Sequence, residues 1–267
     1  YYHLHRADRP RLDRLMSTVT GLLTANAARW KAAKLTRASE FGPVAKRLVA
    51  AKVRYQAVAA KTGVPWFVIA VIHQRESSQN FSRSLAQGDP WNQVSTHVPK
   101  GRGPFKTWEE AAIDALVNCA PYASRWKDWS PGGTMTLLEQ YNGLGYASKG
   151  LPSPYVWSGT DQYVSGKYVA DGVFSATAVD KQLGCAGLIM AMAVLDPSIS
   201  FSGNVPVLTD APIPQTKPPA SKSDKAVVVA SATAAGAATA QYGLWIGVGV
   251  AALLIVSAFL YFKFIRK

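Results

Sequence analysis

The segment that decides the fold is VPWFVIAVIHQRESSQNF, residues 64–81. Pro65 suits the first turn of a helix, and residues 66–75 are too apolar for a helix on the surface. The face predicted to be buried carries Phe67, Val68, Val71 and Ile72. Polar residues that favour the end of a helix follow at Ser77, Ser78 and Asn80. The pattern therefore places Glu76 at the far end of a buried helix.

A carboxyl group at the end of an apolar helix has chemical consequences. Partial burial against apolar neighbours raises its pKa, which is what a general acid working near neutral pH requires. The alternative interpretation is that Glu76 is a solvated residue that pairs with Arg75. Position alone favours this second interpretation.

Three stretches carry a family resemblance. Residues 64–81 resemble the catalytic-helix signature of lytic transglycosylases and goose-type lysozymes, in which a proline-started apolar helix ends in Glu-Ser. LLEQYNGLGYASKG, residues 137–150, resembles the Tyr-Asn-Gly motif of the same superfamily, and GDPWNQVSTHVPKGRGPF, residues 88–105, resembles phage or prophage lysozymes. The resemblance covers roughly residues 60–200. It implies a mainly α, lysozyme-like domain with a small β-hairpin or loop lip.

The resemblance also implies an activity and its site. The enzyme would cleave the β-1,4 bond between N-acetylmuramic acid and N-acetylglucosamine in peptidoglycan, with Glu76 as general acid and base. The motif residues that would bind the glycan strand are Ser77, Tyr141, Asn142 and Gly143. No cofactor is expected, and four histidines at scattered positions argue against a multi-histidine metal centre.

One segment departs from the family pattern. Typical transglycosylases carry Gly-Leu-Met-Gln after the catalytic helix, and this chain has the polar residues 88–97 instead. Asp89 is the candidate for a second carboxylate that positions water, and the alternative is an Asp-Pro turn. His97 is interpreted as a hydrogen-bonding residue of the cleft or loop, and not as a base. With a water-holding Asp89 the product is hydrolysed; without it, Glu76 acts alone and an anhydro sugar forms.

Aromatic residues follow the Tyr-Asn-Gly motif in residues 152–168, which are predicted to form a loop beside the cleft. Tyr155, Trp157 and Tyr163 are its candidate sugar contacts. Further candidates for sugar stacking are Trp91, Trp108, Trp126, Trp129 and Tyr146. Large aromatic residues more often belong to the core, so only one or two are expected to face the cleft.

Positive charge is concentrated in residues 1–62. The chain has a net charge of +13, and this segment holds 13 Lys/Arg against 3 Asp/Glu. It is predicted to form two or three basic amphipathic helices. The first would lie on a membrane surface, be a trimmed anchor or, as is commoner, pack against the body. The charge points to an anionic partner or to a solvated basic face. Nucleic acid is the least favoured partner, because no zinc finger or RNA-binding aromatic motif accompanies the charge.

A membrane anchor is predicted near the C-terminus. Residues 243–262 carry no charge, which gives about 30 Å of helix, the thickness of a bilayer core. We expect a lysozyme-like domain at 63–201, a Pro/Ala/Ser/Lys-rich linker at 202–241, a transmembrane helix at 242–264 and a basic cytoplasmic-type tail at 265–267. The body would lie on the periplasmic or outer side, or belong to a phage virion. Small residues that permit a homo-oligomer are Gly243, Gly247 and Ala251.

Two questions stay open at this level. Cys119 and Cys185 either pair in an oxidising compartment or remain buried free thiols, and a cysteine peptidase lacks an activating neighbour in sequence. The alternative to an enzyme is a structural or glycan-binding protein of a virion or envelope. The composition, 48% hydrophobic and 17% charged, excludes whole-chain disorder, and two cysteines exclude a disulfide scaffold and a four-thiolate zinc site.

Overall fold

The computed structural model describes residues 9–86, 88–97 and 99–201. Eight α-helices, two short 3₁₀ helices and one pair of strands make up the regular structure of these residues, which confirms the predicted mainly α fold. They divide into two compact units, which we describe separately. The first comprises residues 9–165 and 179–201, and the second is the segment Gly166–Ala178.

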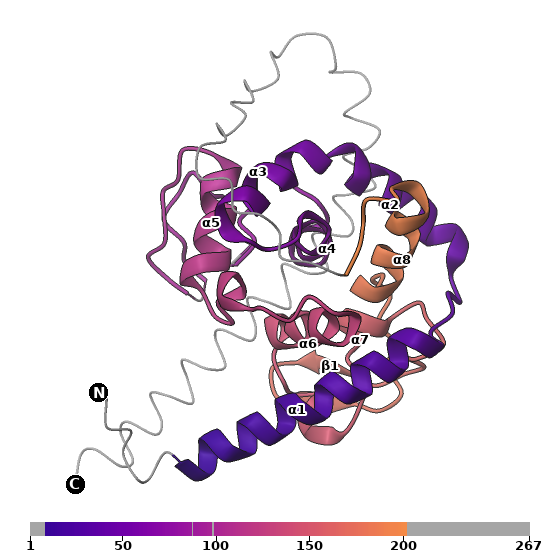
Figure 1. The fold of residues 1–267 in the computed structure, drawn as a ribbon. Helices are drawn as coiled ribbons and strands as arrows, with labels where there is room; N and C mark the ends of the chain where they lie inside the picture. Colours follow the sequence, from indigo (N-terminus) through magenta and orange to yellow (C-terminus); the bar gives the residue numbers. More distant parts are fainter. Residues whose placement is uncertain (1–8, 87, 98, 202–267) are drawn as a thin grey trace, which may run out of the picture. The chain divides into compact units, whose positions relative to one another are not determined.

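Helix α4 (Trp66–Ser77) is the centre of the first unit (Figure 1). Every residue from Trp66 to His73 is buried, because the helix is apolar on all sides and has neighbours all round. The prediction of a buried helix at this position is confirmed. Among the helices that pack against it are α2 (Ala38–Ala50), α3 (Lys52–Thr62), α6 (Pro131–Asn142) and α8 (Cys185–Leu195).

The basic N-terminal segment contains three helices, of which α1 (Arg9–Ala32) is the longest. Phe41 and Leu48 of α2 and Tyr55 of α3 are fully buried in the same hydrophobic cluster as α4. The described part of residues 1–62 thus shares one core with the helices that follow. Among the positions predicted for the first helix, packing against the body describes α1 from Val19 onward.

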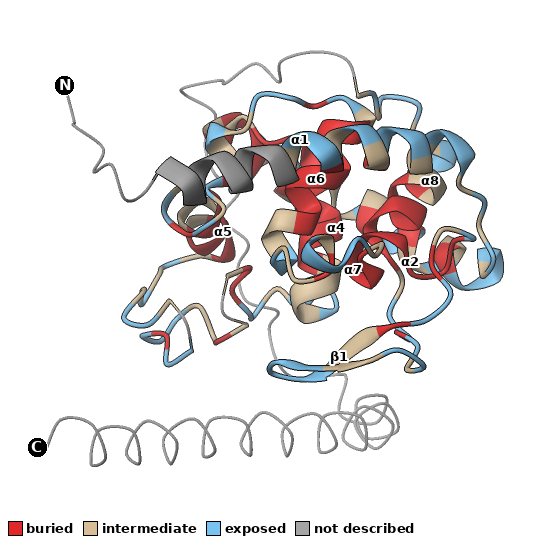
Figure 2. Cartoon of the chain, turned by 90° about the horizontal axis from the view of Figure 1, so that it is seen from below, coloured by how far each residue is buried: buried red, intermediate tan, exposed pale blue. Residues whose placement is uncertain are grey.

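Helix α1 lies across α6 (Figure 2). The fully buried Asn26 Nδ2 donates to Thr136 Oγ1 at 3.2 Å and to Glu139 Oε2 at 3.4 Å. The helices approach closely at Gly132, where a Cβ atom would lie 2.7 Å from the carbonyl oxygen of Leu23. A glycine is required there because any side chain would push α1 away.

Two further helices border the core. Helix α5 (Trp108–Asn118) begins after Thr107, whose hydroxyl accepts the N–H of Glu110. The Trp108 ring lies 4.7 Å from that of His73 on α4. Helix α7 (Pro154–Trp157) is a single turn. The two 3₁₀ helices are Ala123–Arg125 and Ala147–Lys149. Residues 152–168, predicted as a loop, therefore include a helical turn.

The second unit is a hairpin. Strands β1 (Lys167–Ala170) and β2 (Val173–Ser175) pair antiparallel, with Tyr168 opposite Phe174. The two rings meet edge to face at 5.4 Å, as cross-strand aromatic pairs prefer. Residues 88–97, where a hairpin or loop lip was predicted, hold no named strand among those described. They form a loop, tied to Arg83 by a single β-bridge at Pro90.

The predicted membrane anchor and linker, residues 202–267, lie outside the described residues. Within the described part of the chain, no individual helix has both the length and the apolar character needed to cross a bilayer. Helices α3 and α4 reach that length together, with a bend of 112° between them.

Candidate functional site

Glu76 lies in the last turn of α4, where the backbone reverses. Ser78 adopts the left-handed conformation with φ 54°, and its N–H donates to the carbonyl of Gln74. The N–H of Gln79 donates to the carbonyl of His73 at 3.2 Å, so a second carbonyl at the helix end has a hydrogen-bond partner. The predicted helix end is confirmed, and it leaves the Glu76 side chain only partly buried.

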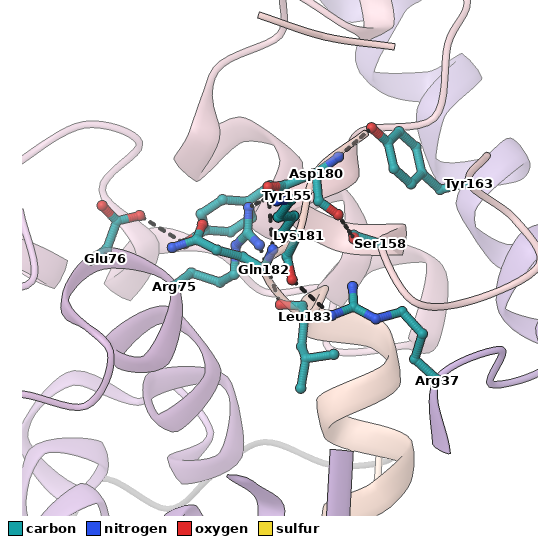
Figure 3. A network of polar contacts seen from close by, with 10 residues as sticks. All are labelled: Arg37, Arg75, Glu76, Tyr155, Ser158, Tyr163, Asp180, Lys181, Gln182 and Leu183. Carbon is teal, nitrogen blue, oxygen red and sulfur yellow. Dashed lines mark hydrogen bonds and ion pairs between the residues drawn. The ribbon is translucent and has the colours of Figure 1, made fainter. Parts of the chain in front are cut away.

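The Glu76 carboxyl group has one side-chain hydrogen-bond donor, Tyr155. The Tyr155 hydroxyl donates to Glu76 Oε1 at 2.8 Å (Figure 3). Burial raises the pKa of Glu76 to about 7, because the loss of water outweighs the opposite effects of Tyr155 and the Arg75 charge. Near neutral pH this carboxyl group exists in both protonation states, so it can donate a proton and take one back.

Tyr155 comes from α7, which begins after the buried Ser153. Its side chain is buried, and burial raises its pKa well above the ordinary value, so the phenol remains a donor. The sequence suggested Tyr155 as a sugar contact. The structure instead places its hydroxyl group on the Glu76 carboxyl, a relationship that no local sequence pattern indicated.

Arg75 does not pair with Glu76 in this structure, although the two residues are adjacent. Arg75 Nη2 lies 2.9 Å from Asp180 Oδ2, and both side chains are almost fully buried. Its Nη1 donates to the carbonyl of Leu183 at 3.3 Å, and its guanidinium lies 4.8 Å from the centre of the Tyr155 ring. The alternative of a solvated Glu76 paired with Arg75 is therefore wrong for this geometry.

The Tyr-Asn-Gly motif forms the C-terminal end of α6. The hydroxyl group of Tyr141 donates to the carbonyl of Leu85 at 3.3 Å. Burial, and then the charge of Glu76, raise the pKa of Tyr141, which associates the two side chains electrostatically. Asn142 and Gly143 are exposed, and Gly143 ends the helix with φ 95°. Asn142 is thus free to meet a ligand from solvent.

Ser77, the residue after Glu76, has a local structural contact. Its hydroxyl group donates to the carbonyl of His73 at 3.2 Å, one turn back along α4. A serine that bonds to its own helix in this way helps to close the helix end. The side chain remains only partly buried.

Asp89 organises the loop of residues 88–97. Its Oδ2 accepts the N–H groups of Thr96 at 2.8 Å and His97 at 3.0 Å, and its Oδ1 lies 2.6 Å from Nδ1 of His97. Burial acts to raise its pKa, but the bonds from His97 and Thr96 outweigh burial and lower it. Asp89 and His97 were both candidate site residues, and the structure brings them together as a pair.

The start of this loop lies against the end of α4. A Cβ atom at Gly88 would lie 3.9 Å from the carbonyl oxygen of Glu76. Arg83 Nη1 donates to the carbonyl of Gly88 at 3.0 Å, and the N–H of Ser84 donates to that of Asp89 at 2.8 Å. These contacts keep the loop beside Glu76.

The candidate aromatic residues differ in exposure. Trp157 is fully buried, so its ring belongs to the core and not to a sugar-contact surface. Trp91 and Trp126 remain partly exposed, and Trp91 stands in the loop with Asp89, where its Nε1 donates to the carbonyl of Phe81 at 2.7 Å. The other buried candidates are Trp108, Trp129, Tyr146 and Tyr163.

The cysteines and the acidic groups do not form other familiar sites. Cys119 and Cys185 are both buried free thiols in this structure. Among the described residues, no group of three or more His, Cys, Asp and Glu side chains is arranged to hold a metal ion.

The site thus unites residues from four places in the chain: Glu76 from α4, Tyr155 from α7, Tyr141 from α6 and the backbone of the loop that carries Asp89. In comparisons with protein-family models, with curated proteins and with solved structures, nothing matches this chain.

Proposed function

We propose that this protein is a peptidoglycan glycosidase that cleaves the β-1,4 bond between N-acetylmuramic acid and N-acetylglucosamine. The observation that carries the proposal is the partly buried Glu76 carboxyl, bonded to Tyr155 and with a pKa of about 7. The resemblance of residues 64–81 and 137–150 to the lysozyme-like superfamily supports it independently. Glu76 would serve as the general acid and base.

The first step is protonation of the leaving oxygen. Protonated Glu76 gives its proton to the glycosidic oxygen, the bond from that oxygen to C1 of the muramic acid breaks, and positive charge develops on the ring. The exposed Asn142 is placed to contact the N-acetyl groups or ring hydroxyls of the glycan strand. Trp91 is the partly exposed aromatic residue best placed to stack on a sugar, because it shares the loop of Asp89.

The second step depends on the role of Asp89. Its two oxygens are already engaged by His97 and Thr96, which favours a structural role in the loop. We therefore propose that Glu76 acts alone. Its carboxylate takes the proton from the 6-hydroxyl group of the muramic acid as that oxygen bonds to C1, and a 1,6-anhydro sugar results.

The proposed setting is a membrane-tethered enzyme. The uncharged residues 243–262 would anchor the chain, and residues 202–241 would give the body a reach of roughly 35 Å as a random coil. Such a leash would let the body act on cell-wall material away from the bilayer, for example from a phage particle during entry.

The deciding experiment is a clearing assay on purified peptidoglycan with the full chain and Glu76→Gln. Loss of a general acid costs about 10²- to 10⁴-fold in rate, so the variant should clear almost nothing. Glu40→Gln, a change of the exposed acid on α2, is the matched control and should behave as the wild type. Equal clearing by wild type and Glu76→Gln would remove Glu76 from the mechanism.

Mass spectrometry of the released muropeptides then tests the route. We expect anhydro ends throughout, whereas reducing ends would restore Asp89 as a water-positioning base. A wild type that binds the glycan strand without releasing fragments would instead support a non-catalytic, glycan-binding role.

A further inference from the structure

A permanent cation stands next to the proposed acid. Arg75 and Glu76 are consecutive residues in the last turn of α4, and an arginine side chain is long enough to reach a neighbouring carboxyl group. An Arg75–Glu76 ion pair would keep the carboxyl group ionised and remove it as a proton donor. The structure contains a different arrangement, in which the guanidinium is held elsewhere.

Asp180 holds it. The Asp180–Arg75 ion pair is 2.9 Å long, and the exposed fractions of the two side chains are 7% and 6%. The carbonyl of Leu183 accepts a second bond from the guanidinium. In this position the cation lies over the Tyr155 ring, and Tyr155 supplies the hydrogen bond to Glu76 (Figure 3).

The position of Asp180 is itself fixed by its neighbours. Its backbone N–H donates to the hydroxyl group of Tyr163 at 3.0 Å, and its carbonyl accepts the hydroxyl group of Ser158 at 2.8 Å. Its second carboxylate oxygen accepts the N–H of Gln182 at 3.4 Å. The carboxylate is therefore oriented toward Arg75 by the segment that precedes α8.

We propose that Asp180 is a positioning residue for Glu76: it retains the Arg75 guanidinium against the Tyr155 ring, so that Tyr155 and not Arg75 is the partner of the Glu76 carboxyl. The proposal rests on the proposed function only for the role of Glu76 as an acid. The arrangement of Asp180, Arg75 and Tyr155 is a property of the fold.

The other groups near Glu76 show why the location of this cation matters. Tyr141 from α6, Tyr155 from α7 and Cys185 from α8 interact with the charge of Glu76, and burial raises the pKa of all three. All three are thus neutral at pH 7. Arg75, by contrast, carries a permanent positive charge. Its distance from Glu76 therefore decides how readily the carboxyl group loses its proton.

The test is a direct titration of Glu76 without substrate. The full chain, kept in detergent because of residues 243–262, is labelled with ¹³C at its glutamate carboxyl groups and titrated by NMR. It has five glutamates, so Glu76→Gln identifies the signal. In Asp180→Asn we expect the Glu76 midpoint to fall by about one pH unit or more, since a freed arginine lowers a carboxyl pKa by about 1–3 units.

Two controls bracket this result. Asp180→Glu keeps the charge and should restore most of the midpoint, whereas Asp161→Asn, which removes an exposed acid, should leave it unchanged. The pH profile of peptidoglycan clearing should move to acid by the same amount in Asp180→Asn. A folded Asp180→Asn protein with an unchanged Glu76 midpoint would overturn the proposal.

A second variant decides the matter if Asp180→Asn does not fold, because an unpaired buried arginine is costly. The double variant Arg75→Met, Asp180→Leu removes both charges, a change that proteins often tolerate. Its Glu76 midpoint should stay at or above the wild-type value, since no freed arginine is present to lower it; a midpoint that falls as in Asp180→Asn would show that Asp180 does not act through Arg75 and would contradict the proposal. A midpoint shift in a chain that fails to clear peptidoglycan would contradict the proposed function alone.

Discussion

Glu76 and Asp89 are two sheltered carboxyl groups at neighbouring segments of the site, and their pKa values move in opposite directions. Glu76 accepts one side-chain bond, from Tyr155, and its pKa rises to about 7. Asp89 accepts two backbone N–H groups and contacts the His97 ring, and its pKa falls below the ordinary value. Burial acts to raise both values; it prevails at Glu76, whereas the bonds from His97 and Thr96 prevail at Asp89.

The comparison separates two roles for acidic residues at one site. A carboxylate with several donors stays ionised and holds a loop in shape. A carboxyl group with one donor and little water keeps its proton to neutral pH and is available for proton transfer. Sequence motifs name both residues as acids, but only the three-dimensional surroundings of each carboxyl group, its burial and its donors, distinguish the roles.

After the loss expected for Glu76→Gln, the largest expected effect is that of pH on the wild type. Glu76 must be protonated to act as an acid, and above its pKa of about 7 the protonated fraction falls tenfold for each pH unit. The initial rate of peptidoglycan clearing should therefore be about fiftyfold lower at pH 9 than at pH 7. A rate that is constant from pH 6 to 9 would show that Glu76 does not titrate as the comparison requires.

Removal of the single donor to Glu76 should have the next largest effect. In Tyr155→Phe the ring stays buried but the hydrogen bond is lost, so the carboxyl group loses its orientation and its pKa rises. We expect clearing to fall about tenfold at pH 6, where Glu76 is protonated in both proteins. Tyr168→Phe, on the hairpin, is the matched control and should leave the rate unchanged.

The raised pKa of Glu76 also predicts a change in stability with pH. The folded protein retains a proton that the unfolded chain releases between the ordinary value of 4.5 and about 7, so this group becomes destabilising as pH rises through that window. Glu76→Gln should remove the penalty. The stability of Glu76→Gln relative to wild type should therefore be about 1–3 kcal/mol greater at pH 8 than at pH 4.5, a range that allows for the partial exposure of the side chain. Urea unfolding at the two pH values measures this, and parallel curves would argue against a buried, proton-retaining Glu76.

The smallest effect on activity is expected for Asp89. In Asp89→Asn the amide oxygen can still accept the N–H of Thr96, but His97 no longer contacts a charged carboxylate. We expect clearing within about threefold of wild type and unchanged anhydro products, because the residue shapes the loop without joining the chemistry. A loss of more than a hundredfold, or a switch in product type, would make Asp89 a second catalytic group.

The sequence predicted the helical elements well because their signals are local. The apolar run from Trp66 to His73, the start at Pro65 and the polar end at Ser77 each follow from neighbouring residues. The charge pattern that set residues 1–62 apart from the rest of the chain did not reveal how these residues pack. Lys46 and Arg47 of α2 are exposed, but Phe41 on α2 and Tyr55 on α3 lie in the common core. Arg54 of α3 pairs with the buried Glu109 at 2.6 Å.

The sequence predicted several residues of the candidate site, but it did not predict which of them contact one another. Glu76, Tyr141 and Asp89 were named from motifs and helix ends. The Tyr155–Glu76 bond and the Asp180–Arg75 pair join residues that are 79 and 105 positions apart, and no periodicity can reveal such a contact. Trp157 was misassigned because an aromatic residue in a polar segment looks the same in sequence whether its ring is packed or open to solvent.

The bond from Asn26 to Glu139 has a practical consequence for anyone trimming the chain. A fragment that begins at residue 63, where the motif resemblance starts, would lack the Asn26 amide that donates to Glu139. It would also expose to water the face of α6 that α1 covers. That helix ends in Tyr141 and Asn142, so the loss would reach the motif that we propose contacts the glycan strand. The smallest self-sufficient fragment must therefore start upstream of Asn26, well outside the stretch that similarity alone would delimit.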